Sequence, residues 1–292
     1  MTIAPSGQQF ELHYNDQHAV VVEVGGGLRD YTVGDTPILD GYRMNEMAAG
    51  ARGQVLAPWP NRLDAGAYPF DHHHHELPLS EPARHNAIHG LVRWSSWRAI
   101  EVDAATVIMS HLLHPQPGYP FVLDVRITYA LIDRGLHVTT TATNAGDRTL
   151  PLGLGFHPYV AAPPEADTHR LHVPATQLLE TNDRGIPTGH RLVQEVPELD
   201  FRTPAPIGER HLDHCFTELA RDADGRAHVS LDRVDVWMGP AFSHVMVFIP
   251  PDRSGVAIEP MTCAPDAFNN GEGLVVLGPG ETLTTDWGIS VP

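Results

Sequence analysis

A regular alternation of apolar and polar side chains between residues 121 and 144 constrains the fold more than any other feature of the sequence. Apolar residues stand at every second position from Phe121 to Leu131, with polar or small residues between most of them. Successive side chains of a β-strand point to opposite faces, so this period of two predicts a strand with one buried face. Asp133-Arg134-Gly135 can turn the chain, and the residues from 136 to 143 are rich in β-branched side chains that suit a strand. The segment therefore predicts a long antiparallel hairpin.

Shorter strand patterns recur along the rest of the chain, whereas helical periodicity sustained over ten residues is nearly absent. Twenty-six glycines and twenty-six prolines separate these patterns. Because each sheet has an apolar face that another layer must cover, many short strands predict an all-β fold, a large antiparallel β-sandwich. The expected strands are 19–24, 97–102, 106–112, 150–156, 228–236, 244–249, 256–259 and 283–291.

The domain organisation is predicted to be simple. A chain of 292 residues with 42% hydrophobic content can bury a sizeable core, and no shift of composition marks a boundary, so we expect a single domain over residues 1–292. The segment 163–206 has few strand signals, and we expect it to form surface loops.

The charge balance is strongly acidic. Nineteen Lys and Arg against thirty-six Asp and Glu give a formal net charge of -17, which repels phosphate backbones and anionic membrane surfaces. The first residues lack a basic start followed by an apolar core, and no stretch approaches the roughly 20 apolar residues that span a bilayer. We therefore expect a soluble, cytoplasmic protein with neither nucleic acid nor membrane as a partner.

Cysteine and histidine usage gives little support for a metal site. Cys215 and Cys263 are too far apart in sequence to define ligand spacing or a disulfide framework. The run His72–His75 lies between two short strand-like segments and is typical of a solvated turn. No bound metal is predicted, although the sequence leaves open whether this run binds a metal ion.

The segment Leu152–Tyr159 carries the first candidate catalytic residue. Alternation places Gly153, Gly155 and His157 on one face of a strand, so side chains are missing from that face until the imidazole. Glycine weakens a strand, and two of them beside a histidine favour a floor on which a flat ligand lies, with a packed structural histidine as the alternative.

The segment that ends in Glu259 carries the second. Glu259 follows an apolar run, and Pro260 is expected to stop the strand pairing where the carboxylate emerges. Partial desolvation would raise its pKa toward the range of a general base. The alternative is an exposed glutamate at a strand end.

Three further residues are candidates for ligand binding, each with a structural alternative. Arg62 lies in a proline-rich loop and can offer a planar donor fork to hydroxyls, or it can brace the loop. His89 directly precedes Gly90, which permits close approach of backbone or ligand, but a half-buried structural histidine would look the same. Asp213 can accept hydrogen bonds from sugar hydroxyls or cap a turn.

The order of these segments resembles the aldose 1-epimerase (galactose mutarotase) family. In chain order they are a Pro-Asn-Arg loop, His-Gly with a following Trp, Gly-x-His-Pro-Tyr, Asp with a nearby Phe, and Glu-Pro-x-Thr. The resemblance extends from about residue 41 to the C-terminus. It implies a large antiparallel β-sandwich that acts on a free monosaccharide without a metal or organic cofactor.

The resemblance also implies roles for the five candidates. His157 would be the general acid that protonates the ring oxygen, and Glu259 the general base that removes the proton from the C1 hydroxyl. Arg62, His89 and Asp213 would hold and orient hydroxyls. A protonated His157 beside an ionised Glu259 is expected to give a bell-shaped pH profile that belongs to the coupled pair.

Several alternatives remain at this stage. A non-catalytic sugar-binding or regulatory module could keep the same fold. Residues 89–93 also resemble hexose-6-phosphate 1-epimerase relatives, which need extra basic groups for the phosphate. A glycan-cleaving enzyme would need two carboxylates, for which Glu259 and Asp213 are the available pair. The sequence leaves open whether the sugar is galactose, glucose or an unusual or anionic hexose, and what the oligomeric state is.

Overall fold

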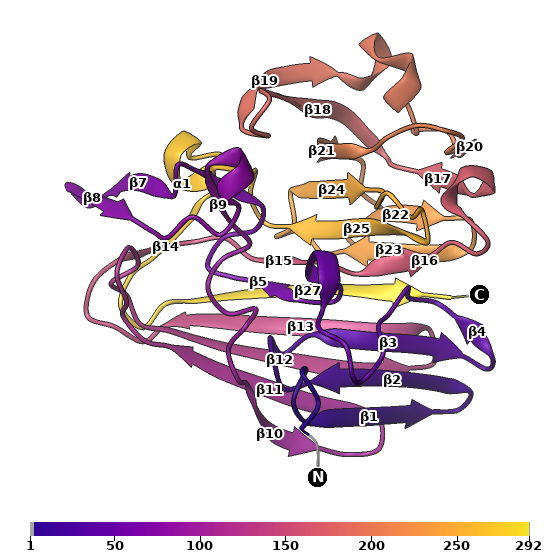
Figure 1. Cartoon of the computed structure of the whole chain (residues 1–292), viewed down its shortest axis with the longest axis horizontal. Helices are drawn as coiled ribbons and strands as arrows, with labels where there is room; N and C mark the ends of the chain where they lie inside the picture. The colour runs from indigo at the N-terminus through magenta and orange to yellow at the C-terminus, as the bar shows by residue number, and fades with distance from the viewer. Residues whose placement is uncertain (1–2, 292) are drawn as a thin grey trace.

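In the computed structural model, which describes residues 3–291, nearly all regular structure is antiparallel β-sheet (Figure 1). The all-β sandwich predicted from the sequence is confirmed. An N-terminal four-stranded sheet comprises β1 (Gln9–Tyr14), β2 (Gln17–Val22), β3 (Leu28–Val33) and β4 (Thr36–Pro37). Strands β1 and β2 pack against β12 of the largest sheet, and this contact forms one part of the core.

The largest sheet has nine strands and contains the predicted hairpin. In spatial order they are β10 (Arg98–Val102), β11 (Thr106–Leu113), β12 (Leu123–Ile132), β13 (Gly135–Asn144), β27 (Thr282–Ser290), β23 (Val234–Met238), β22 (Ala227–Leu231), β17 (Arg170–His172) and β20 (Ala205–Pro206). Strands β12 and β13 pair over their full length, with Ile132 opposite Gly135 at the turn. Residues of β12 alternate between buried and more exposed positions, as the period of two predicts.

The second large sheet has eight strands and carries two of the candidate residues, Asp213 and Glu259. Its strands are β19 (Pro187–Leu192), β18 (Ala175–Thr181), β21 (Asp213–Leu219), β24 (His244–Phe248), β25 (Gly255–Met261), β15 (Gly155–Phe156) and β5 (Val55–Leu56), with β16 (Tyr159–Ala161) also paired to β25. In Figure 1 it lies above strands β10, β11, β12 and β13 of the nine-stranded sheet. Phe156 packs on Trp287 of β27, with ring centroids 5.1 Å apart, so the two sheets share the core.

Short elements fill the connections. Three two-stranded ribbons pair β14 (Leu150–Leu152) with β26 (Val275–Leu277), β6 (Arg62–Asp64) with β9 (Asn86–Ile88), and β7 (Ala67–Phe70) with β8 (His73–Glu76). The helical segments are α1 (Ala267–Asn270) and the 3-10 turns η1 (Ala49–Ala51), η2 (Pro82–Arg84), η3 (Ala166–Thr168), η4 (Val193–Glu195) and η5 (Pro197–Leu199). Among residues 3–291, no helix has the length and apolar character needed to cross a membrane.

Three details of the strand prediction are wrong. The segment 163–206 is not a set of surface loops, because it supplies β17, β18, β19 and β20. Strand β19 is mostly exposed and polar, as is usual at a sheet edge, so it lacks the apolar alternation that marks a strand in the sequence. The expected strands 150–156 and 228–236 are each divided in two, the second by a turn in which Asp232 has a positive φ.

Candidate active site

A pocket of about 400 Å³ lies over one face of the eight-stranded sheet. Asp213 pairs with Phe248, and Glu259 stands two residues beyond the partner of Phe248 on β25. Because side chains two apart on a strand share a face, Asp213, Phe248 and Glu259 all point into this pocket. The opposite face of the same strands carries Val247 and Ile258, which are buried in the core between the sheets.

The pocket brings together all five residues singled out from the sequence. Arg62, His89, His157, Asp213 and Glu259 line it. They come from segments scattered over nearly 200 residues, and the fold brings them around one pocket.

His157 and Glu259 form the most buried part of the pocket. His157 Nε2 lies 3.3 Å from Glu259 Oε1, and their side chains are 5% and 2% exposed. His157 stands between β15 and β16, and its main chain is fixed because its N–H donates to Gln54 O at 3.2 Å. Within the described chain, His157 Nδ1 and Glu259 Oε2 have no hydrogen-bond partner. Buried polar atoms without partners are costly in a folded protein, so these two atoms are free for a ligand.

Burial shifts the proton affinities of the two groups in opposite directions. Removal of the imidazole from water lowers the pKa of His157 to about 3. Burial raises the pKa of Glu259 well above the usual range of a glutamate, and the nearby Asp213 carboxylate adds to the rise. Both shifts favour the uncharged forms of the two groups.

Glu259 reaches this position for a different reason from the one predicted. Strand pairing continues past Pro260 to Met261, which faces His244 on β24 and Gly155 on β15. A proline removes one N–H from the ladder, and here the loss of one donor does not end the strand. Glu259 is therefore an interior position of β25, and this placement explains its nearly complete burial.

The two glycines before His157 do not form an open floor. A side chain at Gly153 would overlap Cys263 Sγ, and a Cβ at Gly155 would come within 2.7 Å of Pro60. The glycines permit close packing of the Trp59-Pro60 segment against this strand, and the predicted cleared surface is wrong.

His89 lies beside His157 in an unusual backbone conformation. The two imidazoles meet edge to face with centroids 5.2 Å apart. His89 has a φ of 63°, and its N–H donates to Asn61 O at 2.9 Å. The close approach allowed by Gly90 is to backbone, since a Cβ there would overlap the carbonyl of Ala57. Burial lowers the pKa of His89 well below the usual range, so this ring is neutral.

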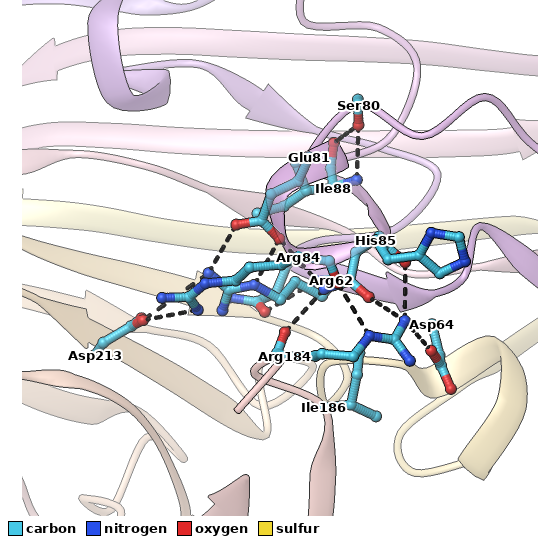
Figure 2. Close-up of polar contacts among 12 residues, drawn as sticks. Arg62, Asp64, Ser80, Glu81, Arg84, His85, Ile88, Arg184, Ile186 and Asp213 are labelled. Atoms are coloured by element: carbon cyan, nitrogen blue, oxygen red, sulfur yellow. Dashed lines mark hydrogen bonds and ion pairs between the residues drawn. The ribbon is translucent and has the colours of Figure 1, made fainter. Parts of the chain in front are cut away.

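The opposite end of the pocket is a charged network centred on Arg62 (Figure 2). Its Nε and Nη2 donate to the two carboxylate oxygens of Glu81 at 2.9 and 3.1 Å, a bidentate pair that fixes the guanidinium plane. Asp213 Oδ2 lies 3.9 Å from Arg62 Nη2 and 3.6 Å from Arg84 Nη1. Arg62 thus both braces the loop and faces the pocket, so the two sequence interpretations are compatible.

Arg184 connects the loop between β18 and β19 to this network. Arg184 donates to the carboxylate of Asp64, to the carbonyl of His85 at 2.8 Å and to Asn86 Oδ1 at 3.0 Å (Figure 2). Asn86 Nδ2 donates back to the carbonyl of Arg184 at 2.8 Å. The following glycine packs directly on Arg62, because a Cβ at Gly185 would come within 2.7 Å of its guanidinium.

Sequence reasoning missed Glu81, Arg84 and Arg184. Glu81 and Arg84 flank a proline in a short 3-10 turn, and no periodic pattern or motif marks them. They become neighbours of Arg62 because the chain leaves β6, forms the β7–β8 ribbon and returns through β9. These residues could be recognised as part of the site only from the tertiary structure.

The histidine run lies outside the pocket. His72 is at the turn between β7 and β8, and His73–His75 belong to β8, where the side chains are mostly exposed. Within residues 3–291, one group of possible metal ligands comes together, formed by Glu11, His13 and His18 on the β1–β2 hairpin. Cys215 and Cys263 are buried free thiols.

Comparison with known proteins agrees with the fold. The family model of aldose 1-epimerase matches residues 8–290, which is nearly the whole chain. The chain belongs to the aldose 1-epimerase family. It is 32% identical over 286 residues to the uncharacterised protein YihR of Escherichia coli, covering 94% of this chain and 91% of the relative.

Solved structures show the same aldose 1-epimerase family fold. A galactose mutarotase-like protein from Clostridium acetobutylicum superposes with a TM-score of 0.85 at 18% identity, covering 97% of this chain and 94% of the other. Galactose 1-epimerase from Lactobacillus acidophilus gives a TM-score of 0.78 at 18% identity, covering 96% and 93%. At this level of identity the likeness establishes the fold, and a sugar substrate follows from the family.

Proposed function

We propose that this protein is a mutarotase that interconverts the α and β anomers of a free aldose. The observation that carries the proposal is the His157–Glu259 pair, 3.3 Å apart at the buried end of a pocket, with one atom of each side chain free for a ligand. Opening a hemiacetal needs one donor and one acceptor at the two oxygens on C1. Hydrolysis by two carboxylates is less well supported, because Asp213 is engaged by Arg62 and Arg84.

The proposed reaction moves one proton in each direction. Glu259 removes the proton from the C1 hydroxyl while the C1–O5 bond breaks, and His157 protonates O5 as its electron pair is released. Rotation about C1–C2 presents the other face of the aldehyde, and the reverse transfers close the ring. No oxidant, reductant or covalent intermediate is needed.

The number of protons held by the two side chains supports this scheme. The neutral form, with imidazole and carboxylic acid, holds one proton, and the form with imidazolium and carboxylate holds the same number. Transfer of that proton from Glu259 to His157 therefore generates the acid and the base without exchange with solvent. A second proton or the loss of the first gives an inactive pair, so we expect a bell-shaped pH profile.

The charged end of the pocket is suited to hold hydroxyls away from C1. Arg62 is fixed by Glu81, and Asp213 presents acceptor oxygens beside it. Such paired donors and acceptors match the pattern of adjacent sugar hydroxyls. His89, neutral and next to His157, lies where it can contact the hydroxyls nearest the reacting carbon.

The test is the rate of anomer exchange from a pure anomer, followed by polarimetry or by the anomeric proton signals. Galactose and glucose come first, because one solved relative is named galactose 1-epimerase. We expect Glu259→Gln and His157→Gln each to lower kcat at least about 10³-fold, the loss typical of removing a proton-transfer group at an active site.

Two controls distinguish the alternatives. Each variant must bind the sugar, as measured by calorimetry. Binding shows that a variant without activity is still folded. Unchanged exchange rates in both variants would refute the assignment. Sugar binding without any acceleration by the wild-type protein would instead identify a binding module, and release of new reducing ends from oligosaccharides would identify a hydrolase.

A further inference from the structure

One face of the His157 imidazole is covered by an aromatic ring, and this ring also contacts an arginine. The rings of His157 and Tyr159 are stacked, with centroids 5.0 Å apart and planes 9° from parallel. Arg52 Cζ lies 4.4 Å from the centroid of the Tyr159 ring, within the range of a cation–π interaction. Tyr159 therefore contacts both the imidazole and the guanidinium, and we call these three residues the Tyr159 stack.

Arg52 and Tyr159 are each held in the stack by specific contacts. Arg52 Nη2 and Nε donate to Asp40 Oδ2 at 2.8 and 3.2 Å, and the arginine side chain is only 14% exposed. Ser254 Oγ donates to the same carboxylate oxygen at 2.7 Å. The Tyr159 hydroxyl donates to Gly50 O at 2.8 Å. Four segments of the chain thus converge to place one guanidinium over one phenol ring.

We propose that Arg52 is a positioning residue for His157. Arg52 acts through Tyr159 to fix the plane of the imidazole, and it places a permanent positive charge near the imidazole. The inference rests on the proposed function, since it assigns a role to a residue behind the proposed acid. Arginine suits this role because its guanidinium is planar, stays charged at all relevant pH values and stacks on aromatic faces.

The charge has a definite consequence for proton transfer. The titratable and charged groups around His157 are Glu259 from β25, Tyr159 from β16, His89 after β9, and the arginines Arg52 and Arg93 from the neighbouring loops. Burial is the main reason that the pKa of His157 falls, and the two arginines add to it because a cation disfavours a second cation nearby. An imidazolium formed in this setting gives its proton readily to the ring oxygen.

Loss of the Arg52 charge should therefore move both limbs of the pH profile in the same direction. Without the nearby cation, the pair gains its second proton more easily, so the acidic limb moves to higher pH. The carboxylate left after loss of the last proton is also less stabilised, so the alkaline limb moves to higher pH as well. We expect a shift on the order of 0.5 to 1 pH unit in Arg52→Met.

Arg52→Lys is the conservative variant and separates charge from geometry. It keeps the positive charge but loses the planar fork that holds Asp40 and lies on Tyr159. We expect limbs close to those of wild type and a kcat lowered several-fold. Arg221→Met is the matched control, because Arg221 donates to the carbonyls of Gly225 and Phe242 and does not line the pocket. Its pH limbs should not move.

A second readout keeps this inference separate from the proposed function. The ring ¹⁵N signals of His157, assigned by their loss in His157→Gln, should show a larger imidazolium fraction in Arg52→Met than in wild type at about pH 4.5. Thermal melting establishes that each variant is folded. A folded Arg52→Met with unchanged ¹⁵N signals and unchanged pH limbs would overturn the role of Arg52. If wild type exchanges no anomers, the mutarotase proposal fails while the ¹⁵N comparison still decides this one.

Discussion

The two ends of the pocket differ in how their polar atoms are satisfied. At the buried end, His157 and Glu259 are nearly inaccessible, favour their uncharged forms, and each has one polar atom without a partner. At the other end, the Glu81 side chain is 22% exposed and makes a bidentate pair with Arg62. Arg84 and Asp213 extend this end as a charged network.

The contrast indicates different tasks for the two sets of titratable groups that line the pocket. A group that must gain and lose a proton benefits from an environment in which neither charge state is strongly preferred by a fixed partner. A group that must hold a ligand in one orientation benefits from partners that fix its own position. Exchange of a single side chain should therefore have different consequences at the two ends.

At the charged end, the largest effect is expected from Arg62. Arg62→Met removes the donor fork and leaves Glu81 without its partner, so kcat/KM should fall about 100-fold, equivalent to ~2.7 kcal/mol of transition-state stabilisation. Glu81→Gln keeps one acceptor for Arg62 and should cost about 10-fold, mainly in KM. Steady-state kinetics with one aldose gives both values. Equal kinetics for Arg62→Met and wild type would mean that this end does not hold the substrate.

Replacing a glutamate by glutamine should change the stability of the protein in opposite directions at the two ends. The pKa of Glu259 in the folded protein lies above its ordinary value of 4.5, so its contribution is most favourable below that pH and is lost as pH rises toward the folded value. Glu259→Gln should therefore raise the free energy of unfolding by about 1–3 kcal/mol at pH 8, with no gain below about pH 4.5.

The matched change at the other end is Glu81→Gln, which weakens an ion pair to a nearly buried arginine and should lower stability by about 1 kcal/mol at pH 8. Chemical denaturation of both variants at pH 4.5 and pH 8 measures the difference. If the two variants change stability in the same direction at pH 8, the contrast between the ends is wrong.

The smallest effect is expected from the loop that packs on Arg62. Arg184→Met breaks the hydrogen bonds to Asp64, His85 and Asn86 that fix the β18–β19 loop. We expect KM to rise about 3-fold with kcat little changed, because the loop supports the binding end and not the proton-transfer pair. Arg191→Met, on the exposed strand β19, is the control. A fall in kcat without a change in KM would connect this loop to the chemistry instead.

The fold was predictable wherever the sequence carries a periodic pattern. The β12–β13 hairpin has one face in the core, so burial imposes an alternation that can be recognised without the structure. Strand β19 has no such face and was missed, because an exposed edge strand places no constraint on which side chains are apolar. Pro260 misled the prediction, since a missing donor weakens a ladder locally but does not end β25.

The site was predictable only in part. Arg62, His89, His157, Asp213 and Glu259 stand in short motifs whose order resembles the family, and the structure gathers them around one pocket. Glu81, Arg84 and Arg52 belong to no motif, because their neighbours are supplied by segments distant in the chain.

The sequence by itself therefore determined the all-β architecture and the residue types at the buried end of the pocket. The tertiary structure decided the surroundings of each group, including the nearly complete burial of Glu259 and the cation held near His157. The physical reason is that apolar alternation is imposed locally by strand geometry. Proton affinity, by contrast, depends on desolvation and on charges that only folding brings within a few ångströms.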